Sequence, residues 1–267
     1  MSVVSVQGHD LYYEVRGRGP RLLFVNGSGS TLDDSRILVD LFVPGFEVLA
    51  FDYRGLGRSG AVTTSYGMAE CAGDGLAVLD AVGWESSRLV GISFGGMVGQ
   101  ELAVTAPGRV ERLALLCTSP GGAGGSSYPL HALEDLGPEE RALLRRRLLD
   151  TRFDDEWLAS HPGDRFLVER LAGRDELSSL PPEAQRGRRE QLQARRGHDV
   201  WDRLGSISCP TFIGCGRFDG IAPMRNSEAI ASRLPGSELH VYEGGHGFLA
   251  QDPSAIPDVV HFLGRDH

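Results

Sequence analysis

A serine, an aspartate and a histidine occur along this chain in an order and in surroundings that could support nucleophilic catalysis. Ser93 lies in the pentapeptide GISFG (91–95), which fits the pattern G-x-S-x-G. In that pattern the serine stands on a sharp turn from a strand to a helix, and the flanking glycines avoid collisions with both elements. Glycines also allow a helix to pack closely on a sheet, so the pentapeptide by itself leaves two interpretations open.

The serine needs a base, and the base needs an acid to orient it, because a serine hydroxyl is a weak nucleophile at neutral pH. Asp219 follows the apolar run TFIGC (211–215), and His246 follows the next run, ELHVY (238–242). Taken singly, an aspartate often forms a turn and a histidine often lies at the surface. The order Ser93, Asp219, His246, with each residue directly after a predicted strand, favours a catalytic triad over these explanations.

The other histidines fit the role of the base less well. His240 lies within a predicted strand and His9 within a predicted hairpin, while His261 and His267 belong to the last helix and the tail. His198 is the one serious competitor. It lies in a helical region upstream of the acid, and we expect it to line the substrate pocket.

Acyl transfer also needs two donors for the oxyanion of the tetrahedral intermediate. The backbone N–H of Phe94, directly after the nucleophile, is the first candidate. The second is the N–H of Ser28, in the flexible loop NGSGSTLDD (26–34) that follows another predicted strand. We expect Asn26 and Gly27, at the start of this loop, to contribute to the lining of the substrate pocket.

A different motif, RGLGRSG (54–60), formally fits the dinucleotide-binding pattern G-x-G-x-x-G. No helix is predicted directly after it, and no strand with an acidic residue to bind the ribose follows at the expected distance. We therefore interpret this segment as a turn that Asp52 and Arg54 help to shape, and we expect no nucleotide cofactor.

The spacing of apolar residues predicts an α/β fold. Two β-rich runs at the N-terminus form a hairpin, and short continuous apolar runs then alternate with helical stretches, as expected for a mostly parallel sheet of about eight strands flanked by helices. The continuous runs are 21–25, 47–51, 87–92, 112–117, 211–215 and 238–242.

The alternation stops between residues 126 and 204, where charged stretches have helical spacing and no strand is predicted. We interpret this segment as a helical cap inserted between two parts of the core, residues 1–125 and 205–267. Its arginines are interleaved with acidic residues, which indicates solvated helix faces.

The composition, with 41% hydrophobic and 24% charged residues, is typical of a globular protein. A net charge of −9 argues against a nucleic-acid partner. The first residues do not resemble a secretory signal, and no apolar stretch is long enough to cross a membrane. Four scattered cysteines without a CxxC pair indicate buried thiols in a reducing compartment. We therefore expect a cytoplasmic protein that binds a small-molecule substrate, without metal, cofactor or membrane partner. The sequence predicts no particular oligomeric state.

Over nearly its whole length apart from the cap, the chain resembles the α/β-hydrolase superfamily, in its single-domain group with a helical cap. The resemblance rests on four motifs, FDYRGLGRSG, GISFGG, GRFDGIAP and EGGHGFLAQDP. The chain departs from many relatives in having Asn26-Gly27 in place of His-Gly. It also lacks the HGGPG loop of the proline iminopeptidase branch, so peptidase activity is not implied.

Together these features predict a cofactor-independent serine hydrolase that cleaves an ester, thioester or lactone of a small to medium organic acid. A carbon–carbon bond hydrolase, an acyltransferase or a lyase or cyclase on the same triad is the alternative. A binding protein on an inactive hydrolase scaffold is disfavoured because all three triad positions are filled.

Overall fold

Strand β3 (Arg21–Val25) contributes alternate side chains to two cores, one on each face of the sheet. In the computed structural model, which describes residues 2–172 and 180–265, Leu23 and Val25 belong to one core and Leu22 and Phe24 to the other. All four are at most 1% exposed. A strand buried on both faces has to be apolar at each position, which explains why this run is continuous in the sequence.

The described residues form one sheet of eight strands in the order β1-β2-β4-β3-β5-β6-β7-β8. The strands are β1 (Ser2–Val6), β2 (His9–Gly17), β3, β4 (Glu47–Phe51), β5 (Ser87–Ile92), β6 (Val110–Leu116), β7 (Thr211–Gly216) and β8 (Glu238–Tyr242). Strand β2 pairs antiparallel with β1 and with β4, and the remaining pairs are parallel. The predicted fold class, including the N-terminal hairpin, is confirmed.

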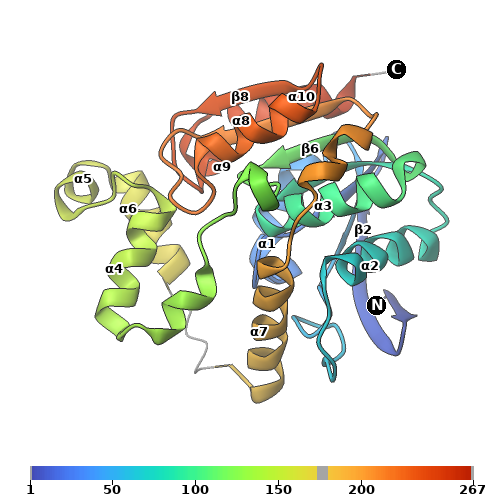
Figure 1. Cartoon of the computed structure of the whole chain (residues 1–267), viewed down its shortest axis with the longest axis horizontal. Coiled ribbons are helices and arrows are strands. Elements are labelled where there is room, and N and C mark those ends of the chain that lie inside the picture. Colours follow the sequence, from blue (N-terminus) through green and yellow to red (C-terminus); the bar gives the residue numbers. More distant parts are fainter. Residues whose placement is uncertain (1, 173–179, 266–267) are drawn as a thin grey trace.

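Helices cover both faces of this sheet (Figure 1). One core takes residues from α2 (Met68–Ala81), α3 (Phe94–Thr105) and α8 (Met224–Arg233). The other core takes residues from α1 (Leu32–Phe42), α9 (Phe248–Gln251) and α10 (Ala255–Gly264). None of the described helices combines the length and the apolar character of a membrane span.

Between β6 and β7 the chain is largely helical, with α4 (Pro138–Leu149), α5 (Asp155–Ser160), α6 (Pro162–Ala172) and α7 (Pro182–Arg196). Figure 1 shows α4, α5 and α6 grouped to one side of the sheet. The described residues from 126 to 204 contain no strand, as the sequence predicts. Residues 173–179 of the predicted cap lie outside the described residues. The division into core and cap at 125 and 204 stays a prediction.

Helix α7 packs directly on the loop after β4. A Cβ atom on Gly187 would lie 2.1 Å from the carbonyl oxygen of Gly55, and one on Gly55 would lie 2.8 Å from the Cα of Gly187. Both distances are far below van der Waals contact. The two backbones therefore meet at a point where only a pair of glycines fits.

The start of α3 makes a similar contact with the end of β3. A Cβ atom on Gly95 would lie 2.0 Å from the carbonyl oxygen of Val25, whereas one on Gly73 in α2 would meet no atom within 4 Å. The two glycines thus share a helical setting and differ in the space around them.

Gly95→Ala is expected to lower the free energy of unfolding by about 1–3 kcal/mol or more, because the added methyl group overpacks the contact with β3. Gly73→Ala, the matched control, is expected to raise it by up to about 1 kcal/mol, since alanine favours the helix and meets no neighbour. Denaturant unfolding of both variants measures the difference. An equal effect at the two positions would contradict this account of the Gly95 contact.

Candidate active site

Ser93 occupies the single residue between β5 and α3, at φ 57° and ψ −113°. A positive φ is strained for a residue other than glycine, and such strain persists only where the surroundings hold the turn in place. Here the Ser93 N–H donates to the Leu116 carbonyl over 2.8 Å, and the Thr118 hydroxyl donates to the Ser93 carbonyl over 2.8 Å. A Cβ atom on Gly91 would lie 2.3 Å from the Gly95 carbonyl oxygen. Both glycines of the pattern are therefore required by the close approach of strand and helix.

The structure brings the three residues of the predicted triad together. His246 Nε2 lies 3.0 Å from Ser93 Oγ, and His246 Nδ1 lies 2.8 Å from Asp219 Oδ2. With Nδ1–H donating to the carboxylate, Nε2 is free to accept the serine proton. Ser93 is 7% exposed as a residue, the Asp219 side chain is fully buried and the His246 side chain is 15% exposed. The arrangement matches the donor and acceptor order of a serine hydrolase triad.

The Asp219 carboxylate is fixed by its own turn. Its Oδ1 accepts hydrogen bonds from the N–H groups of Ile221 and Ala222, each 2.8 Å long. Because Oδ1 is engaged by the backbone, Oδ2 is left to face His246. The strand β7 and the turn after it thus hold the acid in the orientation that the imidazole needs.

The last turn of α4 also contacts both loops of the triad. The Leu148 carbonyl accepts the Gly220 N–H over 3.1 Å, and the Leu149 carbonyl accepts the His246 N–H over 2.6 Å. The last carbonyls of a helix lack partners within the helix, so these bonds satisfy groups that would otherwise be free. The sequence does not indicate this contact, because backbone carbonyls have no residue-type signal.

The predicted oxyanion donors, Phe94 and Ser28, lie in segments that flank Ser93. Phe94 is the first residue of α3. Ser28 follows Gly27, on which an added Cβ atom would lie 3.7 Å from Ser93 Cβ. Among the described residues, neither the Phe94 N–H nor the Ser28 N–H has a hydrogen-bond partner. Their role as an oxyanion hole stays a prediction.

Two side chains that sequence analysis missed hold the loop that carries Ser28. The Tyr53 hydroxyl donates to the Asn26 carbonyl over 2.9 Å, at the start of the loop. The Gly29 N–H donates to the side-chain oxygen of Gln191 over 2.6 Å, just after Ser28. Tyr53 follows β4 and Gln191 belongs to α7, so both the core and the cap region fix this loop.

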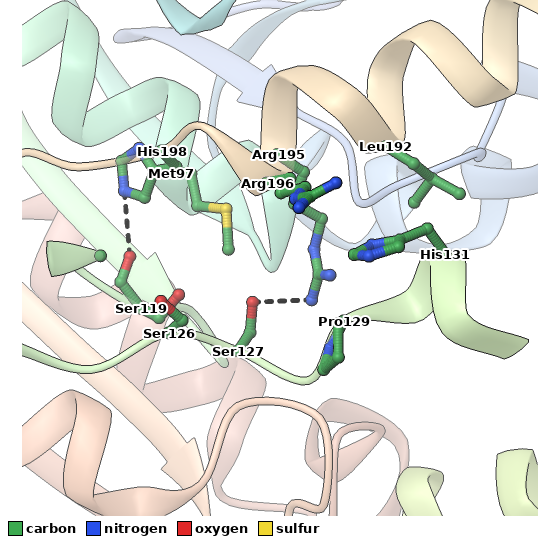
Figure 2. Close-up of a pocket in the computed structure, with 11 residues that line it drawn as sticks. Met97, Ser119, Ser126, Ser127, Pro129, His131, Leu192, Arg195, Arg196 and His198 are labelled. Carbon is green, nitrogen blue, oxygen red and sulfur yellow. Dashed lines mark hydrogen bonds between the residues drawn. The ribbon is translucent and has the colours of Figure 1, made fainter.

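A cavity of about 270 Å³ lies between α3, α7 and the segment after β6 (Figure 2). His198 lines it, together with Met97 of α3 and Arg195 of α7. The role of His198 in a substrate pocket stays a prediction. Asn26 and Gly27 are not among the residues around this cavity. The Asn26 side chain instead turns toward α1.

Hydrogen bonds explain the orientation of Asn26. Its side-chain oxygen accepts the Ser35 hydroxyl, and its amide donates to the Thr31 carbonyl over 3.4 Å. Asn26 is 4% exposed. The side chain therefore braces the loop against the start of α1 and does not face the cavity.

His198 ties the end of α7 to the core. Its Nε2 lies 3.1 Å from the carbonyl oxygen of Ser119, and the side chain is buried. Burial lowers the pKa of His198 to about 4, so the imidazole is neutral at pH 7 and donates from Nε2. The histidine that lies between Ser93 and Asp219 is His246, not His198.

Cys117, Asp219 and His246 offer ligand atoms that all lie within 4.8 Å of one another. Metal binding requires a thiolate, and burial raises the pKa of the Cys117 thiol well above its usual range. The other two side chains are hydrogen-bonded to each other. The arrangement fits a neutral thiol packed beside the acid better than it fits a metal ligand.

The loop RGLGRSG (54–60) folds around a buried carboxylate. Asp52 accepts hydrogen bonds from the N–H groups of Leu32, over 2.6 Å, and Arg58, over 3.0 Å. A Cβ atom on Gly57 would lie 2.3 Å from this carboxylate. Arg54 forms a buried ion pair with Asp74, with Nε 2.7 Å from the carboxylate. The motif therefore forms a turn around the Asp52 carboxylate, and its glycines are explained by this turn.

Comparisons with known proteins agree with this fold. A family model described as alpha/beta hydrolase fold matches residues 20–253. A Variovorax paradoxus protein named "Putative carbamate hydrolase RutD" is 31% identical, over 96% of each chain. A poly(3-hydroxyalkanoate) depolymerase of Ectopseudomonas oleovorans is 26% identical, over 92% of this chain and 84% of its own. The crystal structure of a Pseudomonas aeruginosa hydrolase, 26% identical, has a TM-score of 0.80 and covers 99% of this chain and 98% of its own.

The chain therefore belongs to the α/β hydrolase fold family. It is a hydrolase enzyme, as the family and the relatives establish. The resemblance stated from the sequence motifs is confirmed.

The free energy of unfolding is expected to fall by up to about 3 kcal/mol between pH 6.5 and pH 4 because of His198. The pKa of this side chain is about 4 in the folded protein and 6.5 without burial. In that window the unfolded chain binds a proton that the folded chain does not. Stability from the neutral imidazole is thus complete above pH 6.5 and lost as the pH falls.

His198→Gln is expected to flatten this part of the pH dependence, and His161→Gln, at an exposed position, is expected to leave it unchanged. Urea unfolding at pH 4.5 and pH 7 measures both. Parallel curves for His198→Gln and the wild type would contradict the assignment.

Proposed function

We propose that this enzyme is a serine hydrolase that cleaves an ester, thioester or lactone of a small organic acid. His246 takes the proton of Ser93 as Oγ attacks the substrate carbonyl. Asp219 orients the imidazole and stabilises its charged form. The Phe94 and Ser28 N–H groups stabilise the oxyanion of the tetrahedral intermediate.

Collapse of that intermediate expels the leaving group, which takes its proton from His246, and leaves an acyl group on Ser93. Water then attacks the acyl-enzyme with His246 again as the base. The second tetrahedral intermediate releases the acid and returns the proton to Ser93. Every proton in this cycle passes through the Nε2 atom of one histidine.

One observation carries the proposal: the continuous hydrogen-bond chain from Ser93 Oγ through His246 to Asp219, with spacings of 3.0 and 2.8 Å. The name of the depolymerase relative, whose polymer is a polyester, supports an ester as the substrate. The RutD relatives support a second candidate, a carbamate, whose carbonyl can be attacked in the same way.

Ser93→Ala is expected to lower kcat on an ester substrate by about 10⁴-fold or more, because it removes the atom that forms the acyl-enzyme. Ser232→Ala, at an exposed helix position, is the matched control and is expected to retain wild-type kcat. Steady-state hydrolysis of p-nitrophenyl acetate measures both. Full turnover by Ser93→Ala would contradict the proposal.

Product analysis separates the candidate reactions. Hydrolysis of an ester yields only an acid and an alcohol, and hydrolysis of a lactone yields a hydroxy acid. Hydrolysis of a carbamate is recognised by the release of an amine or ammonia together with carbonate. Carbon–carbon cleavage, acyl transfer to another acceptor and a lyase or cyclase step each give different products from the same serine. Products of one of these last classes, with no hydrolysis of esters or carbamates, would contradict the proposal.

Gln191→Leu is expected to lower kcat by about tenfold, because the Gly29 N–H loses its partner and the loop that carries Ser28 is no longer fixed. KM is expected to change little. Gln185→Leu, on the same helix, serves as the control. A loss confined to KM would contradict a positioning role for Gln191.

A further inference from the structure

The cavity beside α3 has a basic lining in an acidic protein. Two arginines, Arg195 and Arg196, line it, and no aspartate or glutamate is among the described residues around it. The chain as a whole has a net charge of −9. The basic character is therefore a local property of this cavity, and it would favour an anion there.

Arg195 is the buried cation of the group, with 6% exposure. Its terminal nitrogens donate to the Tyr128 carbonyl and to the Ser127 hydroxyl, each over 2.7 Å, and these neutral oxygens are its hydrogen-bond partners among the described residues. Its Nε is buried without a partner. Figure 2 shows the side chain reaching from α7 to Ser127.

A buried cation next to neutral oxygens alone is costly, because it has lost its hydration without gaining an anion. Burial lowers the pKa of Arg195 to about 10, an effect that the charge of Asp219 opposes. The guanidinium is still protonated at neutral pH. Since a guanidinium has five N–H donors and two are engaged within the chain, three remain for a ligand, including the Nε–H.

A short series of hydrogen bonds connects Arg195 to the acid of the triad. Arg195 donates to the Tyr128 carbonyl, and the Tyr128 N–H donates to the Ile221 carbonyl over 2.7 Å. The Ile221 N–H in turn donates to Asp219 Oδ1. The basic cavity thus adjoins the loop that carries the acid.

The cavity lies one helical turn of α3 from the position of Ser93, which is not itself among the residues around it. Met97 lines it and lies four residues after Ser93 in α3, which is about 6 Å along a helix axis. A substrate that reaches both Ser93 and the cavity would need a short spacer between its carbonyl and its second group.

We propose that this cavity binds a carboxylate on the acyl part of the substrate, and that Arg195 is the residue that binds it. The proposal rests on the proposed function and narrows the substrate class to esters or carbamates that carry a second, anionic carboxylate. A guanidinium fork matches a carboxylate in a bidentate manner, with Nε–H as one of the two donors. A volume of about 270 Å³ suits a small organic acid.

The first experiment compares the monomethyl esters of succinic, glutaric and adipic acid with methyl butanoate, pentanoate and hexanoate. In each pair a terminal carboxylate replaces a methyl group at the same chain length, and methanol release is measured. We expect kcat/KM of at least one monomethyl half-ester to exceed that of its neutral counterpart by about 10- to 100-fold. Arg195→Gln is expected to abolish this preference, so that the charged and neutral esters of each pair are hydrolysed with similar kcat/KM.

Arg189→Gln, on the exposed face of the same helix, is the matched control and is expected to keep the preference. Arg195→Lys retains the charge without the fork and is expected to keep part of it. If Arg195→Gln does not fold, Arg195→Lys replaces it as the test variant.

The second experiment measures binding without turnover, in the Ser93→Ala protein. Millimolar glutarate is expected to raise the melting temperature by about 3 °C or more, whereas uncharged glutaramide is not. The shift is expected to disappear in Ser93→Ala/Arg195→Gln. This readout does not depend on the reaction, so a failure of the proposed function leaves it intact.

Two results would overturn the proposal. One is an equal fall of kcat/KM on charged and neutral esters in Arg195→Gln, which indicates that Arg195 only holds the segment at Ser127 and Tyr128. The other is a glutarate shift that persists without Arg195, or none in the Ser93→Ala protein.

Discussion

The turn at Ser93 is the constraint on which the rest of the site depends. Strand β5 passes into α3 through one residue with a positive φ, and this is possible only because Gly91 and Gly95 let the helix backbone approach the sheet. Because the turn is held by hydrogen bonds to β6 and to Thr118, the direction of the serine Oγ is fixed before any substrate binds. The parallel strands then bring the acid and base loops to the same edge of the sheet.

The segment between β6 and β7 completes this site. The end of α4 binds the backbone of both the acid loop and the histidine loop, and Gln191 of α7 holds the loop before α1. Helix α4 is hydrogen-bonded to the loops that carry Asp219 and His246. It cannot move away from these loops without breaking those hydrogen bonds. The cap region therefore contributes to the geometry of the site as well as to its cavity.

The sequence predicts the fold and the proximity of Ser93, Asp219 and His246, because both depend on residue types at strand ends. Continuous apolar runs indicate strands buried on both faces, and parallel strands put Ser93, Asp219 and His246 at one edge. Contacts made by backbone carbonyls, such as that of Leu149 with His246, cannot be predicted in this way.

Side-chain direction is equally hard to infer from sequence. Asn26 turns toward α1 because Ser35 is there to bind it, and its position in the loop does not reveal this. Arg195 lies in a run of charged residues with helical spacing, where a buried arginine looks the same as its exposed neighbours. Only the packing of α7 against the segment at Tyr128 distinguishes it.

The central claim is that Ser93 is the nucleophile of a serine hydrolase. The most direct measurement is mass spectrometry of the protein after treatment with a fluorophosphonate, followed by peptide mapping. A single adduct is expected on the peptide that contains Ser93, and no adduct is expected in Ser93→Ala. An adduct on another residue, or equal labelling of the wild type and Ser93→Ala, would contradict it.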